Sequence, residues 1–203
     1  IDIDCSILAP GDECDDSIEV SVGFTPFSTL LMTPSQPQPD ETSCDASNLV
    51  WANSPDIWLS FTAPSSEAYR FSLCDDEGYD TSMVLYEENC DNQILCNGDA
   101  ADQDDACQPF YSEFEHILTQ DETYFIRIGG WYGDIGTGTL AISLVPPAVP
   151  GACCFPDGSC LEEAMPHDCN AFGGTFEGGG VDCITADCII VEGDECEEAV
   201  EVF

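Results

Sequence analysis

The sequence predicts an all-β fold, a jelly-roll-like β-sandwich followed by a small disulfide-rich module. Up to about residue 147, short runs rich in β-branched and aromatic residues alternate with Gly, Pro, Asp and Asn, which is typical of strands separated by turns. No segment keeps a helical apolar period for three turns. The chain also carries 14 cysteines in 203 residues, a density that favours disulfide cross-links.

Ten such runs are predicted strands, and eight to ten short strands in a segment of this length predict two packed sheets. A hydrophobic content of 43% supplies a core for them. The runs are Ile18–Val22, Phe27–Met32, Leu49–Ala52, Ile57–Ala63, Ala68–Leu73, Thr81–Tyr86, Gln93–Leu95, Phe114–Leu118, Thr123–Gly129 and Thr139–Val145.

The domain organisation follows from a change in composition near residue 147. Residues 1–147 form the predicted sandwich, and the proline-rich stretch 146–150 reads as a stiff linker. Residues 148–188 form the Cys-rich module, which is too small to fold on an apolar core alone and needs cross-links. Its one predicted helix is Leu161–Phe172, and its six cysteines allow fifteen pairings. These cysteines are Cys153, Cys154, Cys160, Cys169, Cys183 and Cys188.

The cysteines favour disulfides over zinc. No CxxC pair occurs, and the only histidines are His116 and His167, whereas structural zinc sites use paired CxxC or HxxxH ligands. Because a cytosol keeps thiols reduced, we expect a secreted protein, extracellular or at the cell surface. The chain begins without a charged and apolar leader. It also lacks an apolar run long enough to cross a bilayer, so no membrane insertion is expected.

The charge restricts the partners. The chain has 41 acidic residues against two basic ones, with a net charge of −39. Nucleic acids and anionic membranes need Lys and Arg for binding, so both are excluded as partners. Self-repulsion of this size predicts screening ions, bound Ca²⁺ or both. Arg70 and Arg127, the only two cations, are expected to form ion pairs with carboxylates.

The termini carry an internal repeat. Residues 5–20 read CSILAPGDECDDSIEV and residues 188–202 read CIIVEGDECEEAVEV, which gives eight identities in fifteen positions with one gap. Residues 189–203 therefore predict either the start of a next repeat or a strand donated to another copy, and a unit with matching ends builds a linear array. The residues expected to make this contact are Cys5, Cys196, Ala199, Val200, Val202 and Phe203.

Four segments resemble a known family: DIWLSFTAP (56–64), YDTSMVLYEENC (79–90), ILCNGDAADQDDAC (94–107) and TYFIRIGGWYGDIGTGTLAISL (123–144). They are similar to the bacterial pre-peptidase C-terminal β-sandwich domain, in the Cys-bearing form of large secreted planctomycete-type proteins. The Cys-rich stretch resembles a GACC-x-PDG-x-C repeat that accompanies such domains. The resemblance implies export and a non-catalytic accessory, binding or surface role. Together with spacing, it implies the disulfides Cys14–Cys44, Cys74–Cys90 and Cys96–Cys107.

Seven aspartates in two acidic loops are candidate Ca²⁺ ligands. Ca²⁺ takes six to eight oxygens from carboxylates and loop carbonyls, so two such loops meeting at one sandwich edge would suit it. The alternative is a solvated acidic face, as on the rest of the surface, and the EF-hand spacing is absent. The candidate ligands are Asp75, Asp76, Asp80, Asp99, Asp102, Asp104 and Asp105.

Other residues give weaker signals. The two isolated histidines have no recognisable catalytic motif around them, and the cysteines are expected to be oxidised. We therefore do not expect an enzyme. Trp58 is expected in the core, whereas Trp131 with Tyr132 could form an exposed platform for a glycan. Ser17 and Thr33 are candidate O-glycosylation sites.

These observations predict a structural repeat unit of an extracellular bacterial fibre or surface array, whose copies join head to tail. The alternative is a Ca²⁺-dependent carbohydrate- or protein-binding accessory module of a large secreted protein.

Overall fold

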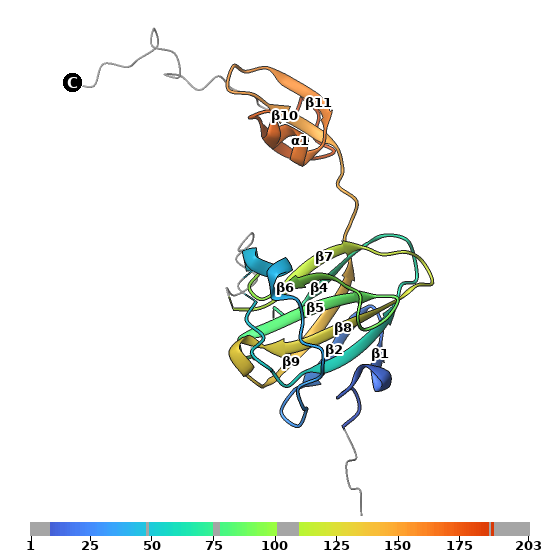
Figure 1. Ribbon diagram of the computed structural model, residues 1–203. Coiled ribbons are helices and arrows are strands. Elements are labelled where there is room, and N and C mark those ends of the chain that lie inside the picture. Colours follow the sequence, from blue (N-terminus) through green and yellow to red (C-terminus); the bar gives the residue numbers. More distant parts are fainter. Residues whose placement is uncertain (1–8, 48, 75–77, 101–109, 187, 189–203) are drawn as a thin grey trace, which may run out of the picture. The chain divides into compact units, whose positions relative to one another are not determined.

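The computed structural model describes residues 9–47, 49–74, 78–100, 110–186 and 188. The chain divides into two compact units, Ile1–Val145 and Pro146–Phe203 (Figure 1). The first is a two-sheet β-sandwich and the second is a small disulfide-rich sheet, so the predicted fold class is confirmed.

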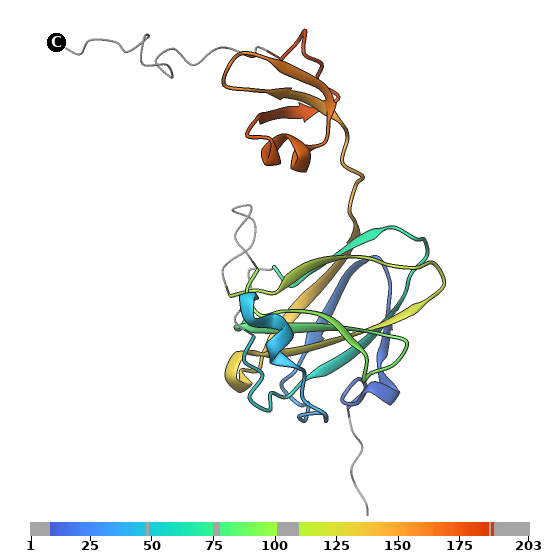
Figure 2. The same ribbon diagram turned by 45° about the horizontal axis from the view of Figure 1, so that its top comes forward.

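In the described part of the chain, nine strands build the sandwich. Figure 2 shows their arrangement in two sheets. All neighbours pair antiparallel except the first and third strands, which run parallel at one sheet edge. One sheet has the order β1 (Ile18–Val20), β3 (Ile57–Thr62), β8 (Thr123–Gly130), β5 (Thr81–Glu87), β6 (Gln93–Asn97). The other has the order β2 (Gly23–Ser28), β9 (Thr137–Leu144), β4 (Ala68–Ser72), β7 (Glu113–Ile117).

The main core lies between the two sheets. Side chains alternate across each strand, so β4 points Tyr69 and Phe71 inward. Both rings contact Phe61 of β3 edge to face, with centroid distances of 5.4 and 5.9 Å, an arrangement that aromatic pairs favour. The remaining fully buried side chains of this core are aliphatic: Leu59, Leu73, Met83, Leu85, Leu118, Ile126, Ile128, Leu140 and Ile142.

A second apolar layer covers the outer face of the five-stranded sheet. Residues 29–56, which we call the strap, contain the 3-10 helix η2 (Glu41–Ser47). Trp51 of the strap packs in one cluster with Trp58, Val84 and Tyr86 of the sheet. Strand β5 is therefore buried on both faces along six of its seven residues, which explains why its sequence is apolar without alternation.

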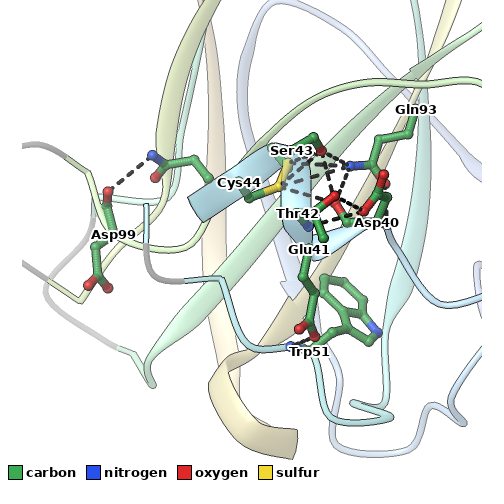
Figure 3. The surroundings of a disulfide bond; sticks show 10 residues. Asp40, Glu41, Thr42, Ser43, Cys44, Trp51, Gln93 and Asp99 are labelled. Carbon is green, nitrogen blue, oxygen red and sulfur yellow. Dashed lines mark hydrogen bonds between the residues drawn. A yellow bond between two sulfur atoms is a disulfide. The ribbon is translucent and has the colours of Figure 1, made fainter. Parts of the chain in front are cut away.

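A disulfide and a hydrogen-bonded glutamine attach the strap to β6 (Figure 3). Cys44 of η2 is bonded to Cys96. The Gln93 side-chain amide donates to the Asp40 carbonyl oxygen at 3.0 Å and to the Ser43 hydroxyl at 2.8 Å. The backbone N–H of Asp40 donates in return to the Gln93 side chain at 2.9 Å.

The second unit is a three-stranded sheet with one short helix. Its strands are β10 (Gly151–Cys154), β11 (Cys160–Ala164) and β12 (Thr175–Gly179), with β10 in the centre, and its helix is α1 (Pro166–Ala171). The adjacent cysteines of β10 point to opposite faces of the sheet, as strand alternation requires. Cys153 therefore reaches Cys169 of α1, whereas Cys154 reaches Cys188. The third bridge joins Cys160 to Cys183.

Three predicted elements differ from the structure. Residues 49–52 are not a strand, because Ala52 and Asn53 adopt left-handed φ angles of 44° and 60°. The second strand ends at Ser28 instead of continuing to Met32. The expected helix 161–172 begins only at Pro166, and β11 occupies the residues before Met165.

The implied disulfide pairings within the sandwich are wrong. Cys14 is bonded to Cys90 and Cys44 to Cys96, which excludes Cys14–Cys44, Cys74–Cys90 and Cys96–Cys107. The expected pairs were close in sequence, whereas the observed ones span 76 and 52 residues because the fold brings distant loops together. Cys74 is also disulfide-bonded, and Cys107 lies outside the described residues. Every cysteine that the structure describes is therefore oxidised.

Replacing Cys44 and Cys96 with serine should destabilise the sandwich by about 4 kcal/mol, because the 52-residue separation restricts the unfolded chain strongly. Urea unfolding followed by tryptophan fluorescence measures this change, since all three tryptophans lie in the sandwich. The matched control is Cys160→Ser with Cys183→Ser, which opens a bridge of the other unit and should leave the sandwich transition unchanged. Equal effects of the two pairs would contradict the assignment.

Candidate functional site

A buried arginine lies between the strap and the outer face of the five-stranded sheet. Arg127 of β8 has 1% of its side chain exposed, and its ion-pair partner Asp56 has none. One terminal nitrogen of Arg127, Nη2, donates to Asp56 at 2.9 Å and to the Ser35 carbonyl at 2.7 Å. The other, Nη1, donates to the Pro37 carbonyl at 2.7 Å. The carboxylate and both carbonyls belong to the strap, and the Tyr86 side chain of β5 also forms a hydrogen bond with this guanidinium.

Two tryptophans contact the same guanidinium. The Arg127 Cζ atom lies 4.9 Å from the ring centroids of both Trp51 and Trp58, a distance at which the ring faces attract a cation. The Trp58 Nε1–H donates to the Ser35 hydroxyl at 2.9 Å, and that hydroxyl in turn donates to Asp56 at 2.7 Å. The group is a structural ion pair, as expected, and Trp58 is core, as expected.

The second arginine is paired on the surface. Arg70 of β4 donates to Glu115 at 2.7 Å, and its Nε lies 3.8 Å from Glu113. The expectation that both cations form ion pairs is confirmed. Each arginine is therefore already paired with a carboxylate.

An aromatic pocket lies at the end of the sandwich where β5 begins and β8 ends. Its volume is about 250 Å³, and it is lined by Gly78, Tyr79, Asp80, Phe110 and Tyr111. Two backbone hydrogen bonds build this corner. The Thr81 N–H donates to the Phe110 carbonyl at 3.1 Å, and the Trp131 N–H donates to the Asp80 carbonyl at 2.8 Å. Asp80 is thus held between the segment that precedes β7 and the turn that follows β8.

The lining is shaped by close packing of glycines on tyrosines. A Cβ atom at Gly78 would lie 2.5 Å from the ring of Tyr111, and one at Gly136 would lie 2.2 Å from the ring of Tyr79. Real Cβ contacts are never that short, so only glycine fits at either place. Glycine backbone therefore packs closely on both tyrosine rings that line the pocket.

Burial and two neighbouring carboxylates raise the pKa of Asp80 to about 6. Burial is the largest cause, followed by the charges of Asp99 and Asp134. The Oδ1 atom of Asp80 is buried and has no hydrogen-bond partner among the residues that the structure describes. Within the described ranges, no hydrogen bond at this oxygen stabilises the ionised form of the carboxyl group.

Two members of the predicted Ca²⁺ set, Asp80 and Asp99, come close together in the described part of the chain. The charges of Asp99 and of Asp134, in the turn after β8, both act on Asp80. Asp134 was missed because it lies 54 residues beyond Asp80 in a turn with no acidic pattern of its own. Asp75, Asp76, Asp102, Asp104 and Asp105 lie outside the described residues. Calcium binding stays a prediction.

The turn after β8 is the 3-10 segment η3 (Trp131–Gly133). Trp131 is 42% exposed and Tyr132 is 69% exposed, with ring centroids 5.6 Å apart. Tyr132 adopts a left-handed φ of 53°, and its N–H donates to the Val50 carbonyl of the strap at 2.7 Å. These two rings are therefore presented on the surface, as the platform hypothesis requires; whether a glycan binds them stays a prediction.

Other candidate residues are placed as follows. The Thr33 hydroxyl donates to Asp12 at 2.9 Å, which argues against a glycan on that oxygen. Ser17 follows the 3-10 helix η1 (Cys14–Asp16) and is half-buried.

His167 lies beside Asp168 on the surface, with Nε2 3.1 Å from Oδ1. Cys154, Cys160 and Cys188 lie within reach of one metal ion, but all three are disulfide-bonded. The predicted inter-repeat residues Cys5, Cys196, Ala199, Val200, Val202 and Phe203 lie outside the described residues.

The oxidised cysteines agree with an extracellular or cell-surface location, because such bonds persist outside reducing compartments. Within the described ranges, no helix has the length and apolar character needed to cross a membrane.

Comparison with known proteins finds similarity in solved structures only. No family model matches the sequence, and no curated protein matches it. The pre-peptidase C-terminal domain of a Bacillus anthracis collagenase is similar at 12% identity over 63% of this chain and 94% of that one, with a TM-score of 0.36.

Two further solved structures are similar at the same level. The periplasmic g-type lysozyme inhibitor PliG of Aeromonas hydrophila has 9% identity over 64% of this chain and 99% of that one, with a TM-score of 0.34. The surface-associated copper-binding protein CorA of Methylomicrobium album BG8 has 8% identity over the same shares, with a TM-score of 0.35. Similarity this weak carries no argument about function.

Replacing Arg127 with methionine should destabilise the sandwich by about 3–5 kcal/mol, because Asp56 is then left buried without a counter-charge. Arg70→Met is the matched control, since an exposed pair contributes about 1 kcal/mol or less. Urea unfolding of the two variants measures the difference. Similar losses for both would show that burial of Arg127 has no special role.

The Asp80 carboxyl should titrate near pH 6 in a carbon-detected NMR experiment, and Asp134→Asn should lower this midpoint. Because its folded-state pKa lies above the ordinary 3.8, the folded protein binds this proton more tightly than the unfolded chain does. The resulting stability is fully present below pH 3.8 and is lost as the pH rises through 6. Asp80→Asn should therefore stabilise the protein at pH 7 but not at pH 3.5, and a midpoint near 4 would contradict the burial of this group.

Proposed function

We propose that the chain is a non-enzymatic structural repeat unit of an extracellular fibre or surface array, and that its units join head to tail through residues 1–20 and 184–203. The observation that carries this proposal is the repeat of the segment GDEC and its flanking residues near both ends. Residues 9–20 of the first copy lie in the described part of the chain.

Three shared residues of the first copy, Gly11, Asp12 and Cys14, form defined contacts in the sandwich. Gly11 has a φ of 82°, which favours glycine, and its carbonyl accepts the Trp58 N–H at 2.7 Å. Asp12 is buried, and its carboxylate accepts both the N–H and the hydroxyl of Thr33. Cys14 is bonded to Cys90. The first copy is therefore a corner that closes one edge of the sandwich.

The same corner continues into an edge strand. Val20 of β1 is buried in the core and lies opposite Phe61 in the parallel pairing with β3. Its neighbour Glu19 points to solvent. The second copy carries Val202 and Glu201 at the same spacing from its GDEC segment.

The second copy has no receiving surface left in its own sandwich. Thr33 and Cys90 are already used by Asp12 and Cys14, so Asp194 and Cys196 need another sandwich that offers equivalent partners. A continuous tandem chain and a strand docked on a separate copy both satisfy this requirement. Either arrangement repeats without closing, which produces a filament.

The alternative is a Ca²⁺-dependent accessory module that binds carbohydrate or protein. The observation in its favour is the meeting of Asp80, Asp99 and Asp134 at one end of the sandwich. Such a module works as a single copy, so it does not use the terminal repeat. The two functions therefore separate in an assembly experiment.

The full chain should form beaded filaments in negative-stain electron microscopy and polydisperse species in light scattering. Val202→Asp should abolish this assembly, because the equivalent valine of the first copy is buried. Glu201→Gln is the matched control and should assemble normally, because the equivalent Glu19 is exposed. Monodisperse single particles from the unmodified chain would contradict the array and favour the single-copy module.

A further inference from the structure

The chain cannot neutralise its own carboxylates. It has two basic residues for 41 acidic ones, and both arginines already hold carboxylate partners. Any further positive charge near the surface must therefore come from outside the chain. A field of this size concentrates cations and speeds the association of cationic partners.

The Asp80 pocket combines one carboxylate with three aromatic side chains. Tyr79, Phe110 and Tyr111 line it together with Asp80 and Gly78, and Phe110 is 59% exposed. Its volume of about 250 Å³ is below the 300–1,000 Å³ of typical small-molecule sites, so the pocket suits one side chain and not a large ligand.

One oxygen of the pocket's carboxylate has no hydrogen-bond partner among the residues that the structure describes. This atom, Oδ1, is buried, although buried polar atoms are nearly always paired. Asp99 and Asp134 add negative charge around it. The electrostatic environment is therefore complementary to a cation, and the aromatic faces around it are attractive to an organic cation.

We propose that this pocket binds an organic cation, the ammonium or guanidinium group of a lysine or arginine side chain presented by a basic partner protein. The aromatic lining contacts the alkyl stem and the charged head, while Asp80 supplies the counter-charge. A calcium ion requires six to eight oxygen ligands, whereas the described lining supplies one carboxylate and three aromatic rings. A neutral sugar would leave the charge of Asp80 uncompensated. This site is independent of the terminal joint and of the array.

The test uses the full chain and n-butylammonium chloride, titrated at constant ionic strength against NaCl. Backbone amide shifts in two-dimensional NMR report binding, and the amides of Thr81 and Trp131 should respond because they flank Asp80. Asp80→Asn and Phe110→Ala should each raise the dissociation constant for n-butylammonium at least threefold. Unchanged spectra in the rest of the sandwich show that each variant is folded.

Two matched controls keep the result specific. Glu67→Gln removes the same charge from the β3–β4 turn, beyond the opposite end of β8, where Thr62 pairs with Thr123. Phe172→Ala removes an exposed phenylalanine from the other unit. Both controls should bind n-butylammonium as the unmodified chain does.

Three outcomes would overturn the proposal. The first is a response to n-butylammonium that is no larger than the response to NaCl. The second is Ca²⁺ shifting the same amides at equal ionic strength when n-butylammonium does not, which would make the pocket a hard-cation site. The third is n-butanol or methyl glucoside producing the same shifts, which would show that the rings bind a neutral ligand without the carboxylate.

Discussion

The structure of the sandwich depends on the burial of one positive charge. Arg127 is placed by β8 in the centre of a sheet, where its guanidinium would lose hydration without compensation. The compensation comes from Asp56 and from two carbonyls of the strap, together with the faces of two tryptophans. These acceptors are in position only when the strap lies on the sheet. Burial of the charge and ordering of the strap therefore require each other.

The parts of the fold that follow from local pattern were predictable, and the parts that depend on distant contacts were not. Strands such as β3 and β8 coincide with their apolar runs. The pattern of apolar residues along a short stretch of sequence is enough to indicate such a strand. Residues 49–52 have the composition of a strand, but Trp51 packs against Arg127 from a turn. The sandwich disulfides were missed for the same reason, since topology joins Cys14 to Cys90 across 76 residues.

The candidate site shows the same division. The acidic loops indicated Asp80 and Asp99, but nothing near them in sequence indicates Asp134 or the rings of Phe110 and Tyr111, which the sheet register brings to Asp80. The terminal repeat is the opposite case. It is visible in the sequence alone, and the structure adds the physical role of its first copy, in which a buried aspartate, a bridged cysteine and a core valine close one sheet edge.

A double-mutant cycle between Arg127 and Asp56 tests the central claim most directly. Arg127→Met, Asp56→Asn and the double variant are compared with the unmodified chain by urea unfolding. If the two groups stabilise the strap as one unit, the loss in the double variant will fall short of the sum of the single losses by about 2 kcal/mol, within the range for contacting pairs. Additive losses, within about 0.5 kcal/mol, would mean that the strap is ordered without this ion pair and would contradict the account.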